Sequence, residues 1–253
     1  MIRQLPLGLR FPPDISFETF VNGTNAEALA AIQACARGAG EGLIFVWGAA
    51  GVGKSHLLQA ACRLADSAGR RVAYIPLREA GSLAPALLEG LEAAELVALD
   101  DVQRVAGDAA WEQALFGLFN RCRERNSRLL VSADGPPDRL ALGLADLATR
   151  LGSGPSYRLE GLDDDQRLVA LRHAAMRRGL ELPSETGRYL LHRHSRDLRL
   201  LFDLLERLDQ ASLAAQRKLT IPFVREVLSQ PAAGTAGFTH HAAGRGDSIR
   251  GHN

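Results

Sequence analysis

The sequence carries no excess of charge of either sign and no long apolar run. Its 30 lysine and arginine residues are balanced by 29 aspartate and glutamate residues, which leaves a formal net charge of +1. A chain with this balance has no overall field that would draw it onto DNA or onto an anionic membrane. Its apolar runs all fall well short of the roughly 20 residues that a membrane-spanning helix needs. We therefore expect no membrane partner.

Cysteine is also scarce, and its positions indicate a reducing compartment. The three cysteines, Cys35, Cys62 and Cys122, are widely spaced and odd in number, which favours small buried thiols over disulfides or metal ligands. The N-terminus lacks the basic region and the continuous apolar core of a signal peptide, because Pro6 and Gly8 interrupt its apolar residues. These features predict a cytoplasmic protein.

Short apolar strands alternate with helical patterns through the first part of the chain. Residues 43–47 form a continuous apolar run that ends at a glycine, as is typical of a buried parallel strand. The alternation predicts an α/β domain over residues 14–160, with helices on both faces of a parallel sheet. Further strands are expected at 71–76, 96–99 and 128–132, and helices at 55–70, 83–94 and 111–125.

The pattern changes after residue 160, where helical spacing continues without strands. We expect a smaller all-helical domain over residues 161–230. Residues 231–253 are rich in alanine, glycine and histidine, and they hold too little apolar surface to offset the entropy of ordering, so we expect a disordered tail. Helices of the second domain are expected at 163–180, 184–194, 197–216 and 222–228.

A phosphate-binding motif follows the first strand. Residues 48–55, GAAGVGKS, fit the P-loop pattern GxxxxGK[ST] between a buried strand and a helix. Its glycines allow backbone N–H groups to point at phosphate oxygens, and the helix N-terminus adds partial positive charge. Lys54 is expected to contact the β- and γ-phosphates, and Ser55 to offer its hydroxyl to Mg²⁺. The nucleotide-binding residues expected here are Gly48, Ala49, Ala50, Gly51, Val52, Gly53, Lys54, Ser55 and His56.

Two carboxylates stand at the end of the strand expected at 96–99. Asp100 can hold Mg²⁺ or its water shell, and Asp101 can orient an attacking water. The alternative is a solvated pair that begins a turn. Beside a P-loop we favour the functional interpretation, although Asp101 is shorter than the glutamate common at that position and has less reach.

The P-loop, the Asp-Asp strand end and the helical second domain together resemble an AAA+ ATPase with a helical lid domain. The DnaA branch is the closer resemblance. Residues 16–25, SFETFVNGTN, are similar to the DnaA segment that closes over adenine. The resemblance implies that Phe20, Val21 and Asn25 contribute to the nucleotide site.

Three further residues take their expected roles from the same resemblance. Asp134 lies in a segment similar to the DnaA sensor 1 strand, which implies a catalytic role. Arg150, within LATRL, resembles the DnaA arginine finger, and Arg199, at the end of RDLR, resembles sensor 2 of the lid. The alternatives are a surface charge at Arg150 and, at Arg199, a side chain that covers apolar surface at the rim of a helix.

The chain resembles the Hda family more closely still. Members of this family are DnaA relatives that inactivate DnaA on the sliding clamp. Residues 215–224, AQRKLTIPFV, are similar to the end of Hda nearly throughout. Residues 106–112 and 179–183 also resemble Hda. The resemblance covers about residues 4–229.

The Hda resemblance also gives a role to the apolar N-terminus. Hda carries a clamp-binding peptide of the form QLxLxL, and Gln4, Leu5, Leu7 and Leu9 fill those positions here. An extended peptide places alternate side chains in a hydrophobic pocket while glutamine fixes its orientation. Residues 1–13 are therefore expected to bind the β subunit sliding clamp of DNA polymerase III and, through it, DNA. The alternative is a segment that packs on its own domain.

The function implied is negative regulation of DNA replication initiation. The protein would bind ADP or ATP with Mg²⁺, possess at most weak ATPase activity of its own, and present Arg150 in trans to ATP on DnaA; a homo-oligomer is also compatible. The competing hypothesis is an autonomous ATPase of the initiator or helicase-loader type, which Lys54 and Asp100 permit. The 23 residues of 231–253 contain no basic recognition helix, which favours the regulator. A P-loop kinase is a weaker alternative.

Overall fold

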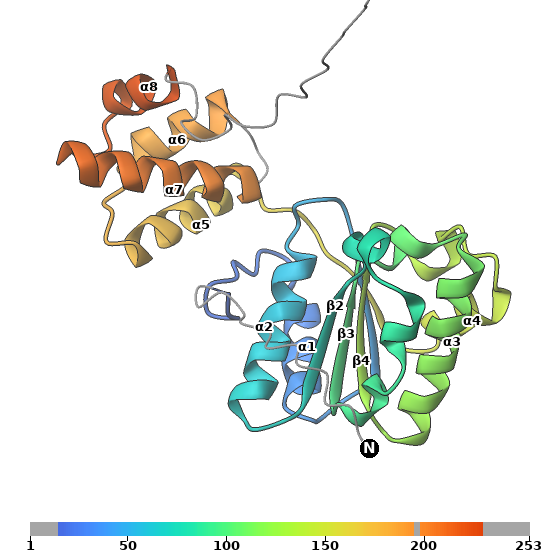
Figure 1. Cartoon of the computed structure of the whole chain (residues 1–253). Coiled ribbons are helices and arrows are strands. Elements are labelled where there is room, and N and C mark those ends of the chain that lie inside the picture. Colours follow the sequence, from blue (N-terminus) through green and yellow to red (C-terminus); the bar gives the residue numbers. More distant parts are fainter. Residues whose placement is uncertain (1–14, 195–197, 230–253) are drawn as a thin grey trace, which may run out of the picture.

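The computed structural model describes residues 15–194 and 198–229. Within these ranges an α/β domain is followed by a helical domain (Figure 1). The peptide expected to bind the clamp, residues 4–9, and the tail 231–253 both lie outside the described residues. Among the residues that the structure describes, no helix combines the length and the apolar character needed to cross a membrane.

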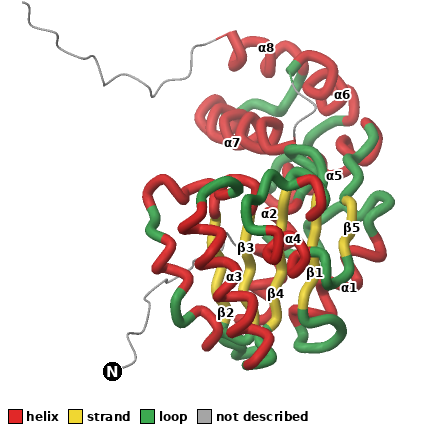
Figure 2. The backbone as a smooth tube through the Cα atoms, turned by 90° about the vertical axis from the view of Figure 1, so that its right-hand side faces the viewer, coloured by secondary structure: helices red, strands yellow, loops and turns green. Residues whose placement is uncertain are grey.

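The α/β domain is built on a parallel sheet, as predicted. In the described part of the chain the sheet has five strands in the order β2-β3-β4-β1-β5 (Figure 2). The apolar runs form its centre, and the two-residue period of each strand sends alternate side chains to opposite faces. The strands are β1 (Leu43–Trp47), β2 (Val72–Pro76), β3 (Leu96–Asp100), β4 (Arg128–Ala133) and β5 (Ser156–Arg158).

Helices cover both faces of the sheet. On one face lie α1 (Ala26–Ala36) and α2 (Lys54–Ser67), which pack against the strand residues Ile44 and Val46. On the other face lie α3 (Ala109–Glu124) and α4 (Ala145–Leu151), which share a core with Phe45 (Figure 1). Three buried free cysteines contribute to these two cores, as the sequence predicts.

The prediction of a helix at residues 83–94 is wrong. This part of the chain instead forms short 3₁₀ turns, η1 (Leu77–Ser82), η2 (Pro85–Leu88) and η3 (Leu91–Ala93). Glu89 is extended and Gly90 adopts a left-handed φ of 81°, so a continuous α-helical ladder cannot pass through these two residues. Further 3₁₀ turns are η4 (Val102–Val105) and η5 (Pro137–Arg139).

The helical domain packs around its own leucine-rich core, as predicted. Helix α5 begins with a capping box: Asp163 accepts from the N–H of Gln166 (2.8 Å), and the Gln166 side chain accepts from the N–H of Asp163 (3.0 Å). Leu171, Leu190 and Leu205 are fully buried in the core that the helices share. Its described helices are α5 (Asp164–Arg177), α6 (Ser184–Arg193), α7 (Leu198–Ala215) and α8 (Ile221–Ser229).

Candidate nucleotide-binding site

The P-loop joins the end of β1 to the start of α2. Gly53, just before α2, has a φ of 99°, a left-handed conformation that glycine adopts without strain. A Cβ atom there would lie 2.6 Å from the ring of Phe20, so the available space also requires glycine. Lys54 begins α2 and donates from Nζ to the carbonyl oxygens of Gly48 (2.7 Å) and Ala49 (3.0 Å). Its side chain therefore spans the loop that would enclose a phosphate.

The tip of the P-loop is open to solvent, whereas its base is anchored. Ala49, Ala50 and Gly51 are exposed. Val52 is half-buried and packs against the core under α2, and Ser55 is half-buried in the first turn of that helix. A ligand can therefore approach the loop at its tip, against a fixed helix N-terminus.

The acidic residues expected around the phosphate do lie near Lys54. Burial lowers the pKa of Lys54, which is only 7% exposed, while the negative charges of Asp101, Asp100 and Asp134 act in the opposite direction. Asp134 follows β4 and is itself exposed. The lysine and these carboxylates thus form one electrostatic group at the carboxyl edge of the sheet.

Asp100 is completely buried and is held by side chains from both neighbouring strands. The Tyr74 hydroxyl on β2 donates to Asp100 Oδ2 (2.6 Å), and the Ser132 hydroxyl on β4 donates to Asp100 Oδ1. Burial, together with the charge of Asp100, raises the pKa of Tyr74 above its usual range, so the phenol remains a donor. Ser132 also accepts from the backbone N–H of Asp101 (2.9 Å). Sequence analysis did not identify Tyr74 or Ser132.

Arg78, another residue that sequence analysis missed, reaches the same carboxylates from η1. Its Nη2 donates to Asp100 Oδ2 (3.2 Å) and to Ser55 Oγ (3.3 Å). Its Nε lies 3.8 Å from Asp101 Oδ2. Burial opposes the charge of Arg78, but Asp100, Tyr74 and Asp101 outweigh it and raise the pKa of the guanidinium. A fixed positive charge therefore sits among the residues expected to hold Mg²⁺.

The residues at this position suit Mg²⁺ by type but not by arrangement. A hydroxyl and carboxylate oxygens are the ligands that Mg²⁺ prefers. The oxygens of Ser55 and Asp100 nevertheless face the guanidinium of Arg78, and both oxygens of Asp100 already accept hydrogen bonds. In the described structure, Arg78 therefore occupies the position between Ser55 and Asp100.

The segment expected to close over adenine packs on the P-loop helix. The ring of Phe20 lies against Gly53 and, with a centroid separation of 5.7 Å, against the ring of His56. His56 in turn contacts the carbonyl oxygen of Ser16 at 2.8 Å, which ties this segment to α2. Both Phe20 and His56 are therefore part of the P-loop surroundings.

The side chain of Asn25 forms two hydrogen bonds with the backbone of Glu160. It donates to the carbonyl oxygen of Glu160 (3.0 Å) and accepts from the Glu160 N–H (2.8 Å). Asn25 is only 5% exposed. It therefore joins the N-terminal segment to the connection that leads into the lid.

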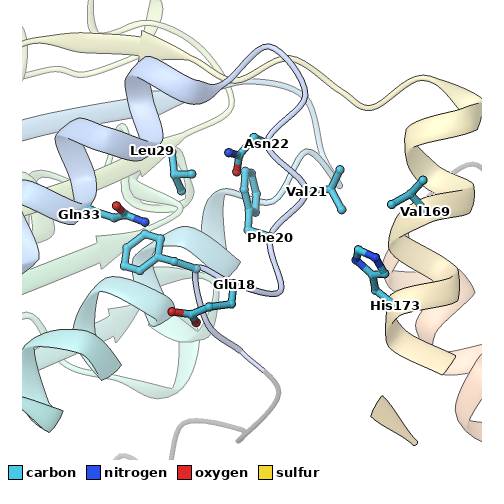
Figure 3. Close-up of a pocket in the computed structure, with 9 residues that line it drawn as sticks. Glu18, Phe20, Val21, Asn22, Leu29, Gln33, Val169 and His173 are labelled. Atoms are coloured by element: carbon cyan, nitrogen blue, oxygen red, sulfur yellow. The ribbon is translucent and has the colours of Figure 1, made fainter. Parts of the chain in front are cut away.

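A pocket of about 450 Å³ lies where the N-terminal segment, α1 and the lid helix α5 meet (Figure 3). Phe20 and Val21 face Val169 and His173 of α5 across it. Because Phe20 also touches Gly53, this residue connects the pocket to the P-loop. The complete lining is Phe17, Glu18, Phe20, Val21, Asn22, Leu29, Gln33, Val169 and His173.

The remaining predicted site residues are in other parts of the fold. Arg150 lies on α4, which is anchored on the α3 face of the sheet by the fully buried side chains of Leu147 and Leu151. Its half-buried guanidinium forms no hydrogen bond or ion pair with any residue that the structure describes. Arg199 is in the first turn of α7, but its side chain lies outside the described part of the structure.

The start of α4 is held by a buried carboxylate on α3. Glu112 is 2% exposed, and its Oε2 accepts from the backbone N–H of Leu144 (2.7 Å), the residue just before α4. Its Oε1 accepts from the N–H groups of Gly107 (2.7 Å) and Gly143 (3.0 Å). Glu112 therefore fixes the position of the helix that carries Arg150.

The fold is that of an AAA+ protein: a P-loop follows β1, Asp100 and Asp101 stand at the end of β3, and a helical lid domain follows the sheet. Comparison with protein families refines that class. Residues 12–157 match the family model of the bacterial DnaA ATPase domain, so the chain belongs to that family. Residues 164–228 match the model of the Hda lid domain, so this is a DnaA-related protein of DNA replication with a lid of the Hda type.

Solved structures show the same fold. Domain III of the replication initiation protein DnaA from Thermotoga maritima is similar with a TM-score of 0.74 and 24% identity, covering 87% of this chain and 97% of that one. AMPPCP-bound DnaA from Aquifex aeolicus is similar with a TM-score of 0.66 and 26% identity, covering 80% of this chain and 67% of that one. The Thermotoga maritima RuvB branch migration motor shares the fold at 16% identity, with a TM-score of 0.65 and coverage of 87% and 72%.

Proposed function

We propose that the chain is a nucleotide-bound negative regulator of replication initiation that stimulates hydrolysis of ATP bound to DnaA. The observation that carries this proposal is the unpaired Arg150. Its helix is rigidly packed, yet its guanidinium has no partner among the described residues. Arginine supplied to another molecule's phosphate stabilises the charge of the transition state and is worth roughly 10³–10⁵ in rate.

The position of α4 supports action on a second molecule. Helix α2, which begins with Lys54, covers one face of the sheet, whereas α4 covers the other (Figure 1). A pocket of about 550 Å³ borders α4 and is lined by Ala148 and Thr149 of that helix together with Pro136 and Pro137. As the partner that α4 would meet on this face, we propose DnaA.

We propose that the chain's own P-loop binds ADP or ATP. The support is the cluster around Lys54, in which a buried lysine spans the loop among three carboxylates. The similar DnaA from Aquifex aeolicus is described as AMPPCP-bound. The nucleotide would hold base and lid together, since the pocket beside Phe20 is lined by both.

We further propose that residues 4–9 attach the protein to the sliding clamp. This part of the proposal depends on the sequence pattern of Gln4, Leu5, Leu7 and Leu9 and is supported by the match of residues 164–228 to the Hda lid. Attachment to the clamp would confine the activity to DNA that carries a loaded clamp.

The test is phosphate release from DnaA-ATP in the presence of clamp-loaded DNA. Arg150→Ala should lower the stimulated rate by roughly two orders of magnitude or more. Arg150→Lys should rescue poorly, because an ammonium cannot form the planar, two-pronged contact of a guanidinium. Arg37→Ala is the matched control, since Arg37 is an exposed arginine at the end of α1.

The same experiment separates the regulator from the competing hypothesis. In an autonomous ATPase, Arg150→Ala would reduce the chain's own ATP turnover and leave DnaA unaffected. Full stimulation of DnaA by the alanine variant would falsify the role in trans that we assign to Arg150.

A further inference from the structure

Arg78 contacts the oxygens that a P-loop protein normally offers to its metal ion. In P-loop sites the motif serine and a strand-end aspartate hold Mg²⁺. Here one nitrogen of Arg78, Nη2, bridges the same two groups, at 3.3 Å from Ser55 Oγ and 3.2 Å from Asp100 Oδ2. We infer that Arg78 takes the place of the divalent cation in this nucleotide site, so that the chain binds a nucleoside diphosphate without Mg²⁺. This inference depends on the proposed nucleotide site.

The fold directs Arg78 to this position. Strands β2 and β3 are paired so that Pro76 stands opposite Asp100. The chain then turns into η1, where the fully buried Leu77 anchors the turn and Arg78 follows immediately. The arginine therefore leaves the sheet one strand away from the carboxylates, within the length of its side chain.

Arg78 compensates the carboxylates from within the chain. Asp100, Asp101 and Asp134 are the negative groups around Lys54, and Arg78 adds a second positive charge that lies directly against Asp100 and Asp101. Asp100 is fully buried, and burying a charged group is costly unless the group is paired and hydrogen-bonded. Arg78 supplies such a pairing at the position that a divalent ion would otherwise take.

The chemistry of the guanidinium suits the β-phosphate of ADP. Arginine presents several N–H donors in a plane, pairs with two phosphate oxygens at once, and gives up water more readily than an ammonium. Mg²⁺ requires near-octahedral ligands and keeps much of its water, and its main use in P-loop sites is to bridge the β- and γ-phosphates. Arg78 can therefore serve a diphosphate well, but it does not reproduce the metal bridge that a triphosphate needs.

The experiment is a calorimetric titration of the full chain with ADP, in excess EDTA and again in millimolar Mg²⁺. The wild-type affinity should change by less than about threefold between the two buffers. Arg78→Gln should bind ADP at least about tenfold more weakly than the wild type in EDTA, the loss expected for one charge-assisted hydrogen bond. Mg²⁺ should restore part of that loss.

Two controls make the result specific. Arg104→Gln replaces an exposed arginine of the neighbouring turn η4 and should behave as the wild type. Paramagnetic resonance of Mn²⁺ reports metal binding directly: with ADP present, Arg78→Gln should bind Mn²⁺ at least about tenfold more tightly than the wild type. Since Arg78 is 35% exposed in its side chain, we expect this variant to fold, and its thermal melt checks that.

The outcomes separate this inference from the proposed function. Wild-type ADP affinity that falls tenfold in EDTA, or equal affinities of the wild type and Arg78→Gln in EDTA, would overturn the role of Arg78 and leave the P-loop assignment intact. Absence of ADP and ATP binding in every buffer would overturn the proposed nucleotide site and this inference together.

Discussion

Replacing Glu112 by glutamine tests whether a buried carboxylate positions Arg150. Three backbone N–H groups converge on Glu112: those of Gly107 and Gly143 on Oε1 and that of Leu144 on Oε2. Glutamine has nearly the same shape but only one acceptor oxygen. In its better orientation it keeps the two bonds on Oε1 and turns its amide NH₂ towards the N–H of Leu144.

The loss of stability in Glu112→Gln follows from the N–H donor that is left without an acceptor. A buried N–H without a partner costs about 1–3 kcal/mol, so Glu112→Gln should lower the free energy of unfolding by that amount at neutral pH. Glu112→Ala removes both acceptor oxygens, so its loss should be larger than that of Glu112→Gln. Urea denaturation at constant temperature measures both.

The pH dependence identifies the carboxylate as the cause. Burial alone would raise the pKa of Glu112, but hydrogen bonds from Gly107, Gly143 and Leu144 outweigh it and hold the pKa below its ordinary value. The ionised carboxylate therefore stabilises the fold above the unfolded-state pKa of about 4.3, and this contribution is lost as the pH falls through the lower folded-state pKa. The stability difference between the wild type and Glu112→Gln should be full at pH 7 and should shrink below about pH 4.

The functional consequence is confined to Arg150. Glu112→Gln loosens the residue that precedes α4, so stimulation of DnaA-ATP hydrolysis should fall while ADP binding stays unchanged. Asp108→Ala is the control, because Asp108 caps α3 by accepting from the N–H groups of Ala110 and Trp111, and its loss costs about 0.5–2 kcal/mol without touching α4. Equal losses of stimulation in the two variants, or a Glu112→Gln protein as stable as the wild type at pH 7, would refute this reasoning.

The remaining predictions concern the P-loop and the N-terminal peptide. Saturation with ADP at 100 Kd stabilises a folded protein by about 2.7 kcal/mol, so the wild type should melt at a higher temperature with ADP, and Lys54→Ala should show a smaller shift. Equal shifts would contradict the assignment of Lys54. Replacing Leu5 and Leu7 together by alanine removes side chains worth roughly 1.5–3 kcal/mol each when buried, so capture by the sliding clamp should fall at least about tenfold at unchanged melting temperature. Undiminished capture would rule out the peptide.

Four of the five strands in the described sheet, β1 to β4, could be predicted from the sequence because they are short, largely apolar runs with sharp ends. The strand expected at 43–47 is β1 (Leu43–Trp47), bounded by the P-loop glycine. The helix prediction for residues 83–94 failed for a physical reason. The buried residues Leu88 and Leu91 are three residues apart, a spacing that suits a 3₁₀ turn as well as an α-helix. The extended backbone at Glu89 and the left-handed backbone at Gly90 decide between the two.

Among the elements that were not predicted, α1 and β5 gave a weak signal. Helix α1 (Ala26–Ala36) buries only two large side chains, Leu29 and Ile32, between small residues, so its apolar stripe is faint. Strand β5 (Ser156–Arg158) has only three residues, none of them fully buried, at the edge of the sheet. It is a strand because it pairs with β1, not because of its own composition.

In the candidate site, too, some residues could be predicted from the sequence and others could not. Its linear motif, the P-loop, and the carboxylates of Asp100 and Asp101 could be read from the sequence because local spacing carries the chemistry. Tyr74 and Ser132 could not, since they reach Asp100 only through the strand order β2-β3-β4, which joins segments far apart in the chain. The order of strands in the sheet is the information that would have identified them.

The proposed function and the inference on Arg78 give these two arginines roles on different molecules. Arg78 is bound to Ser55 and Asp100, so its charge is already used within the chain's own site. Arg150 has no side-chain partner among the described residues, so it would break no ion pair on meeting the phosphate that we propose for it, and its charge-assisted hydrogen bonds would be available in full. If Arg78 stands where Mg²⁺ would bridge the β- and γ-phosphates, hydrolysis in the chain's own site lacks that stabilisation and is slow. Under the proposed function, a nucleotide that persists would keep base and lid in one arrangement, while the ATP whose hydrolysis the chain accelerates would be the one bound to DnaA.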